Sequence, residues 1–360
     1  MGLLQSLAVT ATVCVSALAA AGPASVDTLI EAGHWKRARA EVQAQLKANP
    51  SDAQAHAWLG KIDTAFGDLD SAIREAERAI ELDGRNANYH GLLAEACALS
   101  ADRSSIIKGL QFVRRMKKEV DVSLAIDPRN VDTMLLEMMF SYKAPSIAGG
   151  DKQKARRLAE QVTAISPAWG YLGQARLYQL QGEAGPVVET VLKKAVQADP
   201  GFYRARASLA QFYCGETSCP SPGQAERAAL EAVAVDPNAG AAYVVLARSY
   251  VALKRWGDLE STVSRAEKAN PDDLTPYYAA ARRLIEEGQD FDRAERFLRH
   301  YLSQPTEGRE PTIAEARRLL ADLYQRSGRR NEALHELQLA LQSQPDYELA
   351  KKDLNRLRKF

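Results

Sequence analysis

The segment "GRRNEALHELQLALQSQP", residues 328–345, contains small residues at a spacing that recurs in a distant segment. The segment "GDLDSAIREAERAIELDG", residues 67–84, shares with it Gly, Ala, Ala and a terminal Gly or Pro at steps of five, seven and five. Two helices approach closely only where a small side chain faces a large one, so this spacing of Ala and Gly favours a packed helix pair. The two segments are therefore predicted to be copies of one structural unit.

Similar endings divide the whole chain into units. Segments such as "KANP", "AVDP" and "ELDG" end at positions 50, 84, 128, 167, 200, 237, 271, 305 and 345, most of them 33 to 40 residues apart. The segments between them are rich in Ala, Leu, Glu, Arg and Gln, which favour helices. A period near 34 predicts an array of helix-turn-helix repeats, with a Gly such as Gly328 in the turn and a terminal Pro ending the second helix.

The interior of the units resembles the tetratricopeptide repeat family. One unit carries Tyr243, Leu246, Ala247 and Tyr250 on its first helix, and the last complete unit carries the equivalent set over 320–324. The resemblance covers residues 23–360 and implies an all-α, right-handed superhelix, an α-solenoid of about nine helix-turn-helix units. "IIKGLQFVRRMKKEVDVSLAIDP", residues 106–128, is expected to lengthen one second helix, and the residues after Pro345 to form a C-terminal capping helix.

The N-terminal segment is predicted to be a signal peptide, residues 1–22, which would make the mature protein exported and periplasmic. No charged side chain precedes Asp27, and "LAVTATVCVSALAAA", residues 7–21, is a short apolar stretch that ends in small residues. An uncleaved anchor is the alternative, and membrane contact is expected only through this segment. The loop "APSIAGGDK", residues 144–152, is similar to that of a subgroup of exported bacterial tetratricopeptide proteins, which supports export.

Composition and motifs indicate a protein without catalytic chemistry. The 47 basic and 46 acidic residues nearly cancel, so the total charge gives no reason to expect a nucleic acid partner. The five histidines form no pair at four-residue spacing, and no nucleophile lies beside a base, so no metal site, no cofactor and no enzymatic activity are predicted. In "AGGDK", Asp151 is expected to cap a helix, since no strand precedes the glycines as a phosphate-binding loop would require.

Two cysteines, Cys214 and Cys219 in "CGETSC", are predicted to form a disulfide in an oxidising compartment. Two reduced loop cysteines, or half of a zinc site, are the alternatives. Cys97 is expected to stay a reduced core residue.

The resemblance also implies that the first helix of each unit lines a concave groove through its second, fifth and ninth positions. The residues expected there are Trp169, Arg176, Arg204, Gln211, Arg248, Tyr278, Arg282 and Arg318. Their five guanidinium groups would suit an acidic or carboxylate-bearing segment. The alternative is that acids of neighbouring repeats, such as Asp322, pair with them. We expect a non-catalytic protein- or peptide-binding scaffold; the alternative function is a small-molecule-binding component associated with a transport system.

Overall fold

The computed structural model describes residues 25–215, 218–309 and 311–358, and the predicted signal peptide at 1–22 lies outside them. In these ranges the regular structure is entirely helical. The helices are α1 (Val26–Ala32), α2 (Trp35–Ala48), α3 (Ala53–Phe66), α4 (Leu69–Leu82), α5 (Ala87–Asp102), α6 (Ile106–Ile126), α7 (Val131–Lys143), the short 3-10 helix η1 (Ser146–Ala148), α8 (Lys152–Ile165), α9 (Pro167–Gln181), α10 (Gly185–Ala198), α11 (Tyr203–Cys214), α12 (Pro222–Val235), α13 (Ala241–Ala252), α14 (Trp256–Ala269), α15 (Thr275–Glu287), α16 (Phe291–Tyr301), α17 (Ile313–Arg326), α18 (Arg330–Ser343) and α19 (Glu348–Arg358).

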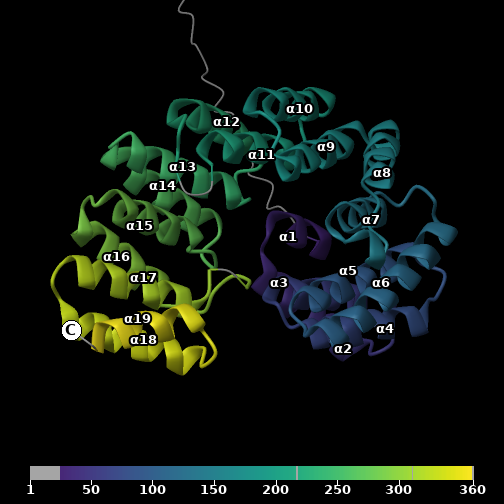
Figure 1. Ribbon diagram of the computed structural model, residues 1–360, viewed down its shortest axis with the longest axis horizontal. Helices are drawn as coiled ribbons and strands as arrows, with labels where there is room; N and C mark the ends of the chain where they lie inside the picture. Colours follow the sequence, from purple (N-terminus) through teal and green to yellow (C-terminus); the bar gives the residue numbers. More distant parts are fainter. Residues whose placement is uncertain (1–24, 216–217, 310, 359–360) are drawn as a thin grey trace, which may run out of the picture.

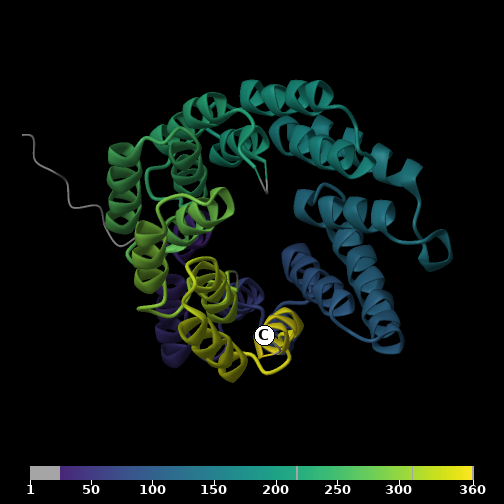
Figure 2. The same cartoon turned by 60° about the vertical axis from the view of Figure 1, so that its left-hand side comes forward.

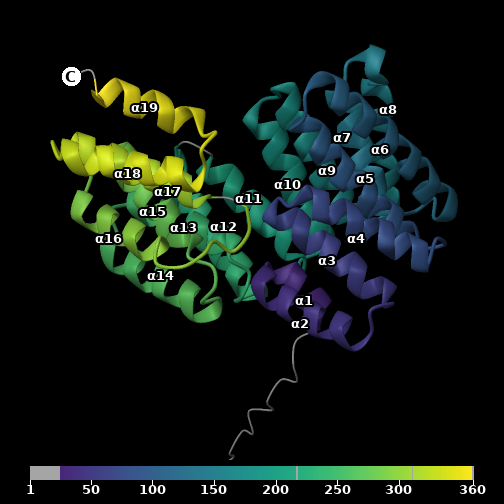
Figure 3. The same cartoon turned by 90° about the horizontal axis from the view of Figure 1, so that it is seen from below.

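The helices form pairs that stack in chain order (Figure 1). Odd-numbered helices are the first and even-numbered helices the second of each pair, from α1 with α2 to α17 with α18. Neighbouring first helices also pack on one another, as α13 does on α15, and α19 packs on α18 at the end of the stack (Figure 3). The predicted all-α stack of about nine units with a C-terminal capping helix is therefore confirmed.

The small residues of the repeat lie where helices come closest. Ala333 and Ala340 of α18 are fully buried, and Leu320, Ala321 and Tyr324 of α17 are at most 2% exposed. Small side chains on the second helix thus accommodate large ones on the first, as the spacing predicts. The buried core runs without interruption from Ala210 to Leu357 between the two layers of helices.

Helix ends follow the predicted signals. Asp151 caps α8, because its carboxylate accepts from the backbone N–H groups of residues 153 and 154. Gly328 lies in the turn after α17 with φ +73°, which other residues disfavour. The second helix α8 ends at Ile165, two residues before Pro167, as predicted, and Pro167 is also the first residue of the next helix, α9. At that position the missing N–H of proline has no helical acceptor and costs nothing.

The lengthened second helix is α6, which has 21 residues, as the extra sequence before Pro128 predicts. Among the described residues no helix is both long and apolar enough to cross a membrane.

The stack bends through almost one full turn, so that its N-terminal helices meet the loops after α14 and α16 (Figure 2). Lys36 in the first turn of α2 contacts Asp272, which is 236 positions further along the chain. The turn of helix pairs therefore closes into a ring.

Candidate functional site

A contact between the start of the stack and the loops after α14 and α16 defines the geometry of the interior. Lys36 donates from Nζ to the carbonyl oxygens of Pro305 at 2.6 Å and Asp272 at 3.2 Å. Its backbone N–H donates to Oε1 of Glu307 at 3.0 Å. Arg309 N–H donates to a backbone carbonyl at the end of α3, at 2.9 Å. We call these interactions, which hold α2 and α3 against residues 272 and 305–309, the closing contact.

A pocket of about 790 Å³ lies inside the ring, between α1 and the first helices α9 and α11. Four residues of the predicted groove line it together: Trp169, Arg176, Arg204 and Gln211. The opposite side comes from α1 and from the closing contact, which contribute Ile30, Glu31 and Glu307. Figure 1 shows α1 inside the turn of the stack, facing the end of α11. The pocket is thus complete only because the ring is closed.

The wall from α9 and α11 is cationic and aromatic. The guanidinium carbon of Arg204 lies 5.7 Å from the centre of the Trp169 ring, a cation–π distance. Arg176 and Arg204 are exposed, and no acidic side chain among the described residues forms an ion pair with either. Gln211 donates from Nε2 to the Gly215 carbonyl at 2.7 Å, which orients its amide. Two guanidinium groups therefore face the pocket with free donors.

The opposite wall is acidic and partly desolvated. Glu307 has a side chain only 1% exposed, and its Oε2 has no hydrogen-bond partner in the part of the chain that the structure describes. Burial raises the pKa of Glu307, although Lys36 opposes this effect. Glu31 is exposed on α1. The pocket thus separates a positive wall from a negative one.

The other four predicted groove residues lie outside this pocket, on later first helices. Arg282 pairs with Glu286 at 2.8 Å, and Arg318 pairs with Asp353 of the capping helix at 2.7 Å. The Tyr278 ring packs 5.3 Å from that of Tyr301, and burial raises its pKa to about 12. Arg248 is half-buried on α13. The neighbouring acid expected as a partner, Asp322, pairs instead with Arg326 at 3.0 Å.

The cysteines of "CGETSC" lie close together at the end of α11. Cys214 and Cys219 are both free and buried in this structure, and Sγ of Cys219 lies 3.7 Å from Oγ of Ser249. The two neighbouring thiols affect each other's ionisation, which lowers the pKa of Cys219 and raises that of Cys214. The disulfide stays a prediction. Cys97 is free and fully buried, and burial raises the pKa of its thiol to about 11.

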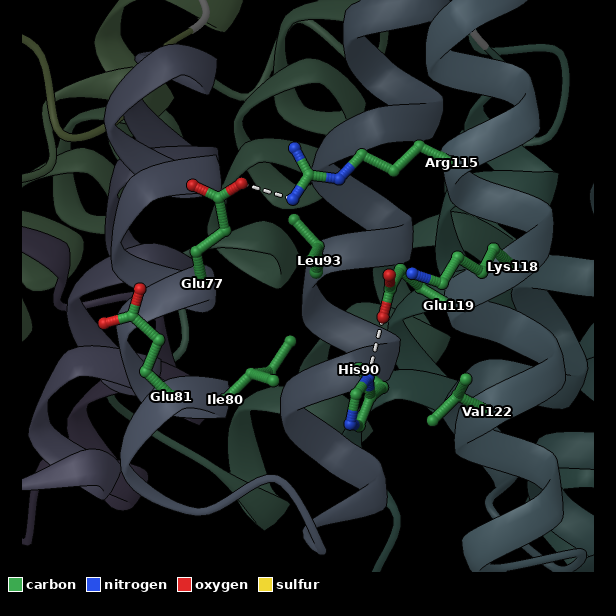
Figure 4. A pocket seen from close by; sticks show the side chains of 9 residues that line it. All are labelled: Glu77, Ile80, Glu81, His90, Leu93, Arg115, Lys118, Glu119 and Val122. Atoms are coloured by element: carbon green, nitrogen blue, oxygen red, sulfur yellow. Dashed lines mark hydrogen bonds and ion pairs between the residues drawn. The ribbon is translucent and has the colours of Figure 1, made fainter.

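A second, smaller pocket of about 450 Å³ lies between α4, α5 and α6 (Figure 4). His90 lines this pocket and makes two contacts: its Nδ1 lies 2.7 Å from Oε2 of Glu119, and its Nε2 lies 3.2 Å from the Gly84 carbonyl oxygen. His56, six residues after Pro50, makes the same pair of contacts with Glu75 and with the Pro50 carbonyl. The repetition indicates a structural role, in which each histidine connects the second helix of its own pair, α4 or α6, to the preceding loop.

Sequence reasoning missed the contribution of α1, the closing contact and the second pocket. The only available signal was the position of His56 and His90, each six residues after a unit end. In the described ranges, no group of three or more His, Cys, Asp or Glu side chains could hold a metal ion.

Comparisons with known proteins agree with the helix-pair architecture. Residues 28–96 match the family model of the tetratricopeptide repeat. A search of curated proteins finds no match. The crystal structure of yeast Tom70 is 14% identical and covers 92% of this chain and 80% of its own, with a TM-score of 0.51. The recognition of tetratricopeptide repeats is confirmed, and so is the superhelical fold.

Two further solved structures are similar over most of this chain. One is that of the APC/C heterotetramer Cut9–Hcn1, with 12% identity, 89% of this chain covered and a TM-score of 0.46; this chain spans 58% of the matched one. The other is a tetratricopeptide repeat protein from Parabacteroides merdae ATCC 43184, with 13% identity, coverage of 85% and 98%, and a TM-score of 0.42.

Proposed function

We propose that this tetratricopeptide repeat protein is a non-catalytic scaffold that holds an acidic or carboxylate-bearing peptide segment in the pocket inside its closed superhelix. The observation that supports the proposal most strongly is the pair of exposed guanidinium groups, Arg176 and Arg204, on the wall of that pocket. A guanidinium group presents two parallel N–H donors to a carboxylate. Two of them on adjacent first helices favour a partner that carries more than one acidic group.

Trp169 adds an apolar surface next to this charge. Its ring lines the pocket beside Arg204, and Phe212 lines the same side. A ligand that pairs with the arginines can therefore also bury an aliphatic or aromatic group against these rings. The negative charge of Glu31 across the pocket disfavours a ligand that is acidic along its whole length. The best fit is a segment with its acidic groups at one end.

The pocket volume supports a second candidate function. About 790 Å³ lies in the range that small-molecule pockets occupy, roughly 300–1,000 Å³. A small carboxylate-bearing metabolite, bound by the same arginines, would agree with a role beside a transport system. The peptide is the first candidate because tetratricopeptide repeats serve in general as protein-interaction scaffolds.

Fluorescence anisotropy with labelled hexapeptides tests the proposal. We expect a peptide with two acidic C-terminal residues to bind the wild type, and Arg176→Ala with Arg204→Ala to weaken binding by roughly 10- to 100-fold per lost charged hydrogen bond. Arg282→Ala is the matched control, because that side chain is already paired with Glu286. Unchanged affinity in the double variant would contradict the proposal, and Arg282→Ala should bind like the wild type. Native mass spectrometry of the purified chain distinguishes the second candidate by a co-purifying small acid.

We also propose export to the periplasm, which rests on the N-terminal sequence alone. N-terminal sequencing of the protein purified from the periplasmic fraction should begin between Ala20 and Pro23. An intact Met1 in a cytoplasmic fraction would contradict export and leave the peptide-binding proposal untouched.

A further inference from the structure

The first turns of α6 expose large apolar side chains to solvent. Ile106 is 83% exposed, Ile107 76% and Leu110 47%, which are among the highest values for large apolar residues in the described chain. Single exposed apolar residues are ordinary, but three within five positions form a contiguous patch. We call these three residues the α6 tip.

Cations follow the α6 tip along the same helix face. Arg114 lies four positions after Leu110, and Lys118 four positions after Arg114, so the three residues align on one side of α6. Both cations are exposed. The buried side of this helix, which includes Met116 and Val120, packs against α5. The solvent side of α6 therefore begins apolar and continues basic.

The local charge differs sharply from that of the whole protein. Residues 102–118 contain six Lys or Arg and one acid, a formal charge of +5, in a chain whose total is +1. Arg115 is neutralised by Glu77, whereas no ion pair joins Arg114 or Lys118 to an acid among the described residues. A positive surface around an apolar patch is thus built into one helix.

We propose that this face of α6 docks on an anionic lipid surface, with the α6 tip inserted at the boundary between headgroups and acyl chains. Membrane-surface helices combine these two features, apolar side chains and basic residues that pair with anionic headgroups. A second copy of the chain is a poorer occupant, since a symmetric contact would bring two +5 segments together. An acidic protein would pair with the cations, but its charge does not account for the three exposed apolar side chains of the α6 tip.

Vesicle flotation of the full chain tests the docking surface. We compare vesicles of phosphatidylcholine with vesicles of an equal mixture of phosphatidylcholine and phosphatidylglycerol, and expect binding to the mixture to be stronger. Ile106→Ser with Ile107→Ser should lower the partition coefficient on the mixture about tenfold or more. Arg114→Glu with Lys118→Glu should lower it about tenfold as well and remove the preference for the anionic lipid. All variants keep the N-terminal segment, so its contribution cancels.

Matched controls place the same changes elsewhere on exposed helix surfaces. Leu230→Ser with Leu349→Ser, and Arg227→Glu with Arg265→Glu, alter exposed residues of α12, α14 and α19. Both controls should bind like the wild type. Equal binding by the α6 variants and their controls would overturn the proposal. The proposal would also be overturned if the wild type were a dimer in solution and Ile106→Ser with Ile107→Ser made it a monomer. That result would show that a second copy of the chain covers this face of α6.

Discussion

Replacing Lys36 with Ala should open the ring without unfolding the helix pairs. The ammonium group of Lys36 donates to the carbonyl oxygens of Pro305 and Asp272 and lies 3.6 Å from Oε2 of Glu307. Alanine removes all three interactions and leaves the backbone hydrogen bond from residue 36 to Glu307 in place. The helix interior is undisturbed, because alanine is the best helix former.

The free energy that Lys36→Ala removes from the closed ring follows from how deeply the closing contact is buried. The Lys36 side chain is 26% exposed and that of Glu307 is 1% exposed, so the ion pair is mostly shielded from water. Hydrogen bonds to charged groups contribute about 1.5–3 kcal/mol, and the remaining exposure of Lys36 places the loss near 2 kcal/mol. A loss of about 2 kcal/mol raises the population of the open ring about thirtyfold.

Hydrogen exchange of the Arg309 amide measures this opening directly, because that N–H donates to Ala65 across the closing contact. In Lys36→Ala we expect its exchange to be about thirtyfold faster. Lys47→Ala, an exposed change on the same helix, is the control and should leave the rate unchanged. Equal protection of the Arg309 amide in both variants would refute the reasoning that Lys36 holds the ring closed.

Three further outcomes are expected. Gly67→Ala and Gly182→Ala should each lower the free energy of unfolding by about 1–2 kcal/mol, because both glycines have a positive φ. Only at Gly67 would the new methyl group also meet a residue of the closing contact, Arg309, so Gly67→Ala should lose more stability in urea unfolding. Equal losses in the two variants would contradict this. Peptide mapping of unreduced protein from the periplasm should show a Cys214–Cys219 link, and two alkylated thiols would argue against it. Because burial holds the pKa of Glu307 above its unfolded value, the stability of the wild type relative to Glu307→Gln should rise as the pH falls through that pKa; a constant difference would count against it.

The local unit could be predicted from the sequence because its signals are local. The buried Ala333 and Ala340, the turn at Gly328 and the cap at Asp151 each depend on neighbours within one helix pair. The repeat register even brought Trp169 and the three residues 176, 204 and 211 to one pocket. The predictions within one helix pair needed only the repeat period and helix geometry, whereas the groove positions followed from the resemblance to tetratricopeptide repeats.

The ring could not be predicted in the same way. Its closure sums small rotations over the eight helix pairs from α1 to α16, and Lys36 meets Glu307 across 271 positions with no sequence signal for either residue. The contribution of α1 to the pocket depends on that closure. The ion pair of Arg318 could not be predicted either, because its partner Asp353 lies on the capping helix α19, outside the repeat that contains Arg318.

Photo-crosslinking tests most directly the claim that the partner binds inside the ring. A photoreactive amino acid replaces Ser208, which lines the pocket on α11, or Arg227, which is exposed on the second helix α12. Each protein is irradiated with hexapeptides that end in two acidic residues. The account predicts a crosslink from position 208 that excess unlabelled peptide abolishes, and none from position 227. A specific crosslink from position 227 with none from position 208 would contradict it.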